Sequence, residues 1–183
     1  MKKNSSQWDK IYRKKGINYA SNLSKWNQVI ESLKQNSVKK ILDIGCGGGN
    51  HLVQLANQGF DVYGIDNSPE ALKKAKANLI KKGIKANLII CDMHKKIPFK
   101  ENTFDAIISL RTLNHGDLKE ITKTFSEINR ILKKGGFIFI TVQKTVGFRN
   151  KLGKSKLNNL KINFIKPRTY IKLESEEEGI IHF

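Results

Sequence analysis

Carboxylates and glycines follow the first apolar runs of this sequence, and their spacing suits the binding of a small polar ligand. Asp43 opens a loop with four glycines, in the segment DIGCGGG that ends at Gly49. Asp66 follows the next apolar run, 21 residues after Gly45, and Asp92 follows the third run. Glycines let the backbone turn tightly and let a ligand approach the main chain without a Cβ in the way. A carboxylate placed like Asp66 can accept the two hydroxyls of a ribose.

The loop favours a cationic nucleoside derivative over a dinucleotide. A dinucleotide fingerprint needs glycine at the first, third and sixth positions of the loop, and counting from Gly45 the sixth position is Asn50. Neighbouring carboxylates would also repel a diphosphate, whereas they would attract a ligand that carries an ammonium and a sulfonium group. A nicotinamide-dependent dehydrogenase is therefore the weakest of the enzyme interpretations.

Apolar runs and helical periodicities alternate along the chain, and this order would bring the carboxylates together. Runs rich in Ile, Val and Phe predict five strands, at 40–44, 60–65, 86–91, 104–110 and 137–142. The apolar spacing between them predicts helices, at 50–58, 69–82 and 117–133. This alternation indicates a doubly wound, Rossmann-like α/β fold, with a mostly parallel sheet and helices on both faces. Ligands of such sheets bind at the carboxyl ends of the strands, where these carboxylates would meet.

Three parts of the chain can be distinguished around this order. Residues 1–37 lie outside the alternation, and we expect a helical segment packed on the core. Its aromatic residues, Trp8, Tyr12 and Trp26 among them, either pack on the core or line a pocket over the sheet. Residues 38–143 would form the ligand-binding core. Residues 144–183 would form a basic connection and a tail.

Several motifs resemble those of the class I S-adenosylmethionine-dependent methyltransferases, in particular small-molecule enzymes of types 11 and 25. VKKILDIGCGGGNHLVQLANQGFDVYGIDNSPEAL is similar to the first two motifs of that family. FKENTFDAIISLRTLNH and EINRILKKGGFIFITV resemble its later motifs, so the likeness extends in order from Trp8 to Val142. The resemblance implies that S-adenosylmethionine is the cofactor, with its methionine end at the loop from Asp43 to Gly49.

The same resemblance assigns further cofactor contacts at the other strand ends. It implies that Asp66 binds the ribose hydroxyls, that Asp92 accepts a hydrogen bond from the adenine amino group, and that Met93 lies against the adenine face. The residues expected to contact the cofactor are Asp43, Gly45, Cys46, Gly47, Gly49, Asp66, Asn67, Asp92, Met93 and Ser109.

The segment after the fourth predicted strand would face the methyl acceptor. His115 is the candidate general base, for an acceptor that must lose a proton. Arg111 and Tyr12 are further candidates for substrate contacts, with Arg111 suited to an anionic group. The segment from Arg111 to His115 has no proline, unlike the loop with which adenine-methylating relatives clamp a flipped base. Cys46 lies in the cofactor loop, where it could not serve a cytosine C5 enzyme. A small-molecule acceptor is therefore favoured.

Composition leaves a nucleic-acid substrate as an alternative. The formal net charge is +18, yet 29 of the 34 basic residues are lysine, which is less suited than arginine to bidentate recognition of phosphate and guanine. The stretch 144–172 holds nine basic residues and no acidic one. An RNA methyltransferase that uses this stretch, and a non-catalytic cofactor-binding module, remain alternatives to a small-molecule enzyme.

The chain also has features that bear on its compartment and assembly. Two cysteines are too few for a disulfide framework or a zinc site, and no apolar run approaches the ~20 residues of a membrane span. The N-terminus lacks the apolar stretch of a secretory signal, so we expect a cytoplasmic protein without a bound metal. Only 41 residues follow Val142, so the family's last two strands would be missing. The strand at 137–142 would then lie near an exposed sheet edge, covered by the tail or by a second copy in a homodimer.

Overall fold

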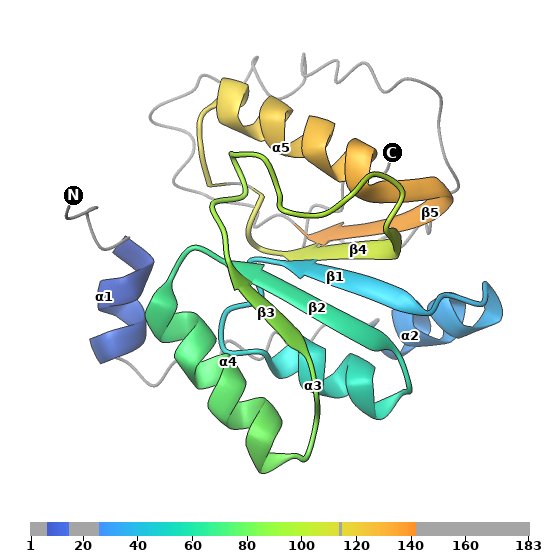
Figure 1. Cartoon of the computed structure of the whole chain (residues 1–183), viewed down its shortest axis with the longest axis horizontal. Coiled ribbons are helices and arrows are strands. Elements are labelled where there is room, and N and C mark those ends of the chain that lie inside the picture. Colours follow the sequence, from blue (N-terminus) through green and yellow to red (C-terminus); the bar gives the residue numbers. More distant parts are fainter. Residues whose placement is uncertain (1–6, 15–25, 114, 142–183) are drawn as a thin grey trace.

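Five parallel strands form the centre of the molecule, as the sequence predicts. The structure is a computed structural model, and it describes residues 7–14, 26–113 and 115–141. The strand order is β3-β2-β1-β4-β5, so the direction of winding reverses between β1 and β4 (Figure 1). The strands are β1 (Lys40–Ile44), β2 (Asp61–Asp66), β3 (Asn87–Ile90), β4 (Phe104–Leu110) and β5 (Leu132–Thr141).

Helices cover both faces of this sheet, which confirms the doubly wound α/β fold. They are α1 (Gln7–Lys14), α2 (Trp26–Gln35), α3 (Asn50–Asn57), α4 (Pro69–Lys81) and α5 (Leu118–Ile131). One apolar cluster joins α2, α3 and α4 to one face, and a second cluster joins α5 to the other. In β1, Ile41 belongs to the first cluster and Leu42 to the second, so adjacent residues point to opposite faces. Both faces are buried, and this is why the strands have continuous apolar sequences.

Two helices begin where side-chain capping predicts. The Ser68 hydroxyl accepts a hydrogen bond from the Ala71 N–H, and Pro69 occupies the first turn of α4. Asp117 and Glu120 form a reciprocal capping box at the start of α5. The first of these caps matters for the site, because it fixes the start of α4 next to the end of β2.

The boundary between α5 and β5 differs from the expectation. Residues 117–133 were expected to be helical, with a strand only from residue 137, but α5 ends at Ile131 and β5 begins at Leu132. Leu132 is 2 % exposed and pairs with Phe104, while Phe137 pairs with Ala106, so the register shifts between the two pairs. The glycines at 135 and 136 therefore lie in this irregular part of the strand rather than after the helix. Burial of Leu132 beside β4 outweighs the helical periodicity.

The N-terminal helices contact the core, and β5 lies at the edge of the sheet. In the N-terminal part, α1 contacts α4, and α2 packs into the first apolar cluster. β5 forms one edge of the described sheet. The predicted basic connection and tail, at 144–183, lie outside the described residues, and so does the expected cover of this edge by the tail. None of the helices in the described ranges is long and apolar enough to cross a membrane.

Candidate functional site

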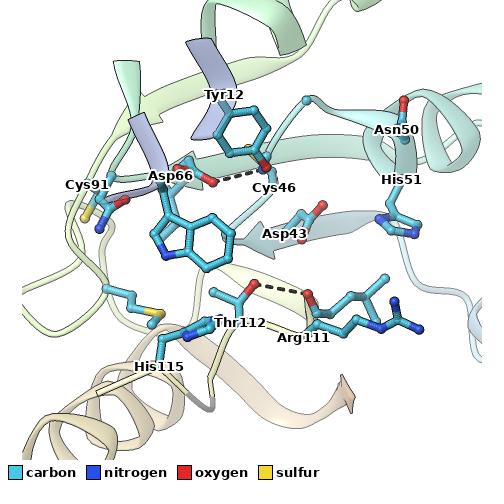
Figure 2. A pocket seen from close by; sticks show the side chains of 18 residues that line it. Tyr12, Asp43, Cys46, Asn50, His51, Asp66, Cys91, Arg111, Thr112 and His115 are labelled. Carbon is cyan, nitrogen blue, oxygen red and sulfur yellow. Dashed lines mark hydrogen bonds between the residues drawn. The ribbon is translucent and has the colours of Figure 1, made fainter. Parts of the chain in front are cut away.

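A pocket opens at the carboxyl ends of β1, β2, β3 and β4, where the fold class predicts a ligand site (Figure 2). Helix α1 supplies part of its wall, so the pocket lies between this helix and the sheet. The lining residues are Trp8, Tyr12, Asp43, Gly45, Cys46, Gly47, Gly48, Asn50, His51, Ile65, Asp66, Asn67, Cys91, Met93, Leu110, Arg111, Thr112 and His115.

The glycine loop after β1 is held against the end of β2 by main-chain hydrogen bonds. The N–H groups of Gly45 and Cys46 both donate to the carbonyl oxygen of Ile65, at 2.8 and 3.0 Å. Gly47 has φ +53°, and a Cβ at this position would collide with the hydroxyl of Tyr12. Glycine is therefore required at position 47 by backbone conformation and by the close approach of α1.

Asp66 is oriented by the loop that it faces. Its Oδ2 accepts a hydrogen bond from the Gly47 N–H and its Oδ1 accepts one from the Ser68 N–H, each at 2.9 Å. Burial raises the pKa of Asp66, and the backbone hydrogen bonds partly oppose that effect. Each carboxylate oxygen has lone pairs beyond these bonds, so Asp66 can accept further hydrogen bonds from a ligand in the pocket.

Asp43 is a buried carboxylate that lacks a complete set of partners. It is 2 % exposed, and its Oδ2 has no hydrogen-bond partner among the described residues. Burial raises the pKa of Asp43 to about 8, and the negative charge of Asp66 adds to this shift. A buried polar atom without a partner is costly, and in native proteins it calls for an explanation. Because Asp43 lines the pocket, a ligand with a donor or a positive charge would supply the missing interaction.

Three residues that the sequence suggested for the cofactor lie beside the pocket rather than in its wall. Asp92 accepts a hydrogen bond from the His94 N–H at 3.1 Å and lies 3.5 Å from the Lys95 Nζ. Ser109 is fully buried and donates to the carbonyl oxygen of Ile44 at 3.0 Å, so it links β4 to β1. Gly49 precedes α3 and packs closely on Ala75 of α4.

The other expected residues do line the pocket, including those expected on the acceptor side. His115 is half-buried, and its ring meets the ring of Trp8 edge-on, with 4.9 Å between centroids. Burial lowers the pKa of His115, a hydrogen bond with the Arg111 backbone opposes this, and the charge of His94 lowers the pKa further.

Arg111 also lines the pocket, and its backbone conformation is strained. Its φ is +56°, which is unusual for a residue with a long side chain. Its N–H lies 2.8 Å from the Thr141 carbonyl oxygen and 3.1 Å from the Thr141 Oγ1, and both accept from it. Strain of this kind gathers at functional sites, where the surrounding structure holds it.

Sequence reasoning missed His51 and Thr112. His51 is 9 % exposed, and its ring meets Trp26 edge-on at 5.0 Å between centroids. Burial lowers the pKa of His51 to about 4, and the positive charge of Arg111 contributes, so His51 is neutral at pH 7. A signal was present, because His51 falls in the first turn after the glycine loop. Thr112 shows no such signal; a Cβ on Gly45 would collide with its side chain.

Known proteins are similar to this chain in sequence. Residues 41–136 match the model of a family described as a methyltransferase domain. A ubiquinone biosynthesis O-methyltransferase of Aliivibrio fischeri is 28 % identical over 115 residues, which are 63 % of this chain and 48 % of that protein. An 18S rRNA (guanine-N(7))-methyltransferase of Schizosaccharomyces pombe is 37 % identical over 86 residues, which are 47 % of this chain and 31 % of that protein.

A solved structure agrees with these relatives. The structure of an S-adenosylmethionine-dependent methyltransferase from Clostridium acetobutylicum aligns with a TM-score of 0.60 and 26 % identity, over 74 % of this chain and 55 % of that one. The chain spans about half the length of the first curated relatives that it matches. The matched region holds β1 to the start of β5, and with them the glycine loop and both pocket carboxylates. The chain therefore belongs to the class I S-adenosylmethionine-dependent methyltransferase family.

Proposed function

We propose that this chain binds S-adenosylmethionine in the described pocket and takes part in transfer of its methyl group to a small-molecule acceptor. The observation that carries the proposal is the pair of pocket carboxylates, Asp43 and Asp66, beside the bare main chain of the glycine loop. Asp43 lacks a partner for one buried oxygen, and a cationic ligand would provide it. The residues present therefore fit the family's cofactor.

The pocket suggests a division of roles among its walls. Asp66 is fixed at both carboxylate oxygens and would accept the ribose hydroxyls. Asp43 would face the positively charged methionine end, next to Gly45 and Cys46. Met93 would offer an apolar surface to the adenine ring, as expected from the sequence. The hydrogen bond that Asp92 accepts within its own turn makes it a supporting residue of this wall.

The chemistry of transfer makes modest demands on the protein. S-adenosylmethionine, held by Asp43, Asp66 and the glycine loop, would supply an electrophilic methyl group on its sulfonium. The pocket must align the acceptor and exclude water. His115 would receive the acceptor's proton where there is one to lose, because its lowered pKa keeps the imidazole neutral near pH 7.

Two observations favour a small acceptor over RNA. The segment after β4 has no proline-containing clamp for a flipped base. The rings of Trp8 and His115 also meet at the pocket wall, where they would restrict the access of a large substrate to the pocket. The relatives include both an O-methyltransferase of ubiquinone biosynthesis and an rRNA methyltransferase, so the acceptor must be determined directly.

Calorimetric titration with S-adenosylmethionine tests the cofactor part. We expect the wild-type chain to bind, and the Asp66→Asn variant to bind on the order of a hundredfold more weakly, because a charge-assisted acceptor is lost. Asp61→Asn is the matched control, since Asp61 is exposed at the opposite end of the same strand. A folded wild-type chain without any affinity, or equal affinities for both variants, would contradict the proposal.

A methylation screen tests the acceptor part. The chain would be incubated with methyl-labelled cofactor and either a metabolite extract or total RNA, and products would be followed by label and by mass. We expect label in small molecules, and less with Asp66→Asn than with Asp61→Asn. Label found only in RNA would assign the RNA alternative. Cofactor binding without any transfer would favour the non-catalytic alternative.

A further inference from the structure

Helix α1 presents two aromatic side chains to the pocket. It is short, so its own hydrogen bonds do little to stabilise it. Trp8 and Tyr12 are four residues apart, so they lie on one face of the helix, and both line the pocket. Figure 2 shows Tyr12 beside Cys46 and Asp66. An isolated helix of 8 residues is not stable in water, so α1 depends on contacts with the rest of the molecule.

Asp9 provides the most complete of these contacts. Its side chain is 4 % exposed, and its Oδ1 accepts hydrogen bonds from the Ser68 hydroxyl at 2.9 Å and from the Glu70 N–H at 3.2 Å. Its Oδ2 lies 3.1 Å from the Arg13 Nη2. Burial raises the pKa of Asp9, but these hydrogen bonds and Arg13 lower it more, so the carboxylate is ionised at pH 7. It thus places a negative charge at the N-terminus of α4, where the helix dipole favours one.

A second contact fixes the other end of α1. The Lys74 Nζ, on the second turn of α4, donates a hydrogen bond to the carbonyl oxygen of Tyr12. The same ammonium lies 5.8 Å from the centroid of the Tyr12 ring. The two contacts together set the direction of α1 along α4, and therefore the positions of Trp8 and Tyr12.

Ser68 connects this anchor directly to the pocket. Its N–H donates to Asp66, while its hydroxyl donates to Asp9 and accepts from Ala71. One residue thus orients the carboxylate expected to bind the ribose, caps α4 and holds α1. The Tyr12 hydroxyl sits against Gly47, whose N–H donates to the same Asp66 carboxylate.

We propose that Asp9 is a positioning residue for cofactor binding: it docks α1 on the start of α4, so that Trp8 and Tyr12 close over the pocket and slow the release of the cofactor. The inference rests on the proposed function, because it takes S-adenosylmethionine as the ligand. Asp9 itself does not line the pocket; it acts through the two aromatic residues. Its loss should therefore change the rate of ligand release more than the rate of binding.

Trp8 provides a direct readout, since the chain has two tryptophans and the other is Trp26. In a Trp26→Phe background, Trp8 is the sole tryptophan. We would compare Asp9→Ala with Asp61→Ala, a matched change at an exposed aspartate, and with Asp9→Asn, whose amide oxygen can still accept from Ser68. Acrylamide quenching of the ligand-free chains reports the docking of α1. Stopped-flow release of S-adenosylmethionine reports its retention.

The proposal predicts a graded result. Asp9→Ala should make Trp8 severalfold more accessible to acrylamide and raise the release rate on the order of tenfold, because a buried charge-assisted anchor is lost. Asp9→Asn should lie between Asp9→Ala and the control. Urea unfolding, followed by far-ultraviolet circular dichroism, should stay cooperative in Asp9→Ala with a midpoint only modestly below that of Asp61→Ala, because the buried Ser68 hydroxyl loses its acceptor while the sheet is retained. If Asp9→Ala does not fold, Lys74→Met breaks the second contact and should show the same two changes at smaller size.

Other outcomes would overturn it. Unchanged quenching would show that Asp9 does not dock α1. Increased quenching with an unchanged release rate would show that docked α1 does not retain the cofactor. If the Asp61→Ala control binds no S-adenosylmethionine at all, the proposed function fails first, whereas the quenching comparison still decides whether Asp9 holds the helix.

Discussion

The two ends of the parallel sheet hold their carboxylates in opposite ways. At the amino ends of the strands, Asp105 of β4 has three hydrogen-bond donors: the N–H groups of Lys39 and Lys40, at 3.1 and 2.8 Å, and the Lys133 Nζ, at 2.7 Å. At the carboxyl ends, Asp43 of β1 is buried, with one oxygen unpartnered among the described residues. The two side chains have the same chemistry on neighbouring strands, yet only Asp105 has a full set of partners.

Asp105 is a carboxylate that stabilises the fold, whereas Asp43 has an oxygen that is available to a ligand. Burial alone would raise the pKa of Asp105, but hydrogen bonds from Lys133 and from the two backbone N–H groups lower it below its usual value. Burial raises the pKa of Asp43 to about 8, and no cation opposes the shift among its causes. At pH 7 the ionised Asp105 therefore favours the folded chain, whereas Asp43, with a pKa of about 8, stays mostly protonated in it and forgoes the ionisation that the unfolded chain gains. Such a cost is typical of functional sites.

The largest expected effect comes from removing the ionisable group of Asp43. We expect Asp43→Asn to raise the free energy of unfolding at pH 7 by roughly 2–4 kcal/mol, because the unfolded chain no longer gains from ionising this group. The same change should weaken S-adenosylmethionine binding at least about tenfold, since the ligand's positive end loses its partner. Urea unfolding and calorimetric titration measure the two effects. If Asp43→Asn is instead less stable than wild type, other interactions in the folded chain already compensate the burial of Asp43.

The pH dependence of this effect has a definite sign. The folded pKa of Asp43, about 8, lies above the ordinary value of 3.8 for an aspartate, so the folded state binds the extra proton between these values and stability falls as pH rises. His51 has the opposite slope below pH 6.5, because its folded pKa is lowered to about 4. The stability difference between Asp43→Asn and wild type should therefore grow by about 1.4 kcal/mol per pH unit from pH 5 to 7 and level off above pH 8, because the His51 contribution cancels in the difference.

The same substitution at the opposite end of the sheet should act in the opposite direction. We expect Asp105→Asn to lower the free energy of unfolding by about 1–2 kcal/mol at pH 7, because the ion pair with Lys133 is lost and the hydrogen bonds to two N–H groups weaken. The folded pKa of Asp105 is lowered, so its contribution to stability is present above the ordinary aspartate value of 3.8 and is lost as pH falls through the folded pKa. Cofactor affinity should not change. If both Asp43→Asn and Asp105→Asn change the free energy of unfolding in the same direction, the proposed difference between the two ends of the sheet is wrong.

The arrangement that creates this contrast could largely be predicted from the sequence. Apolar runs that end in Asp43 and Asp66 define two strands, and the doubly wound order then puts both carboxylates at one edge. The Gly45–Gly49 segment marks the loop between them. These features are local or follow from the order of elements, which is why sequence reasoning finds them.

The parts that could not be predicted depend on side-chain direction and on distant contacts. Cys91 and Met93 line the pocket while Asp92, between them, bonds to its own turn, and no composition rule tells these neighbours apart. Ser109 likewise turns into the sheet. Asp9 and Ser68 are 59 residues apart in the sequence, and neither segment has a pattern that predicts their hydrogen bond.

Substitution of Ser109 has the smallest expected effect. It tests whether this residue stabilises the sheet or contacts the ligand. Its hydroxyl donates to the Ile44 carbonyl oxygen, one residue after Asp43, although the residue was expected to contact the cofactor. Ser109→Ala should lower the free energy of unfolding by about 0.5–1 kcal/mol, the usual contribution of one neutral hydrogen bond, and leave cofactor affinity within about twofold. Urea unfolding and titration of the same samples measure both. If affinity instead falls tenfold while stability hardly changes, Ser109 contacts the ligand after all, and the pocket extends between β1 and β4 when it is occupied.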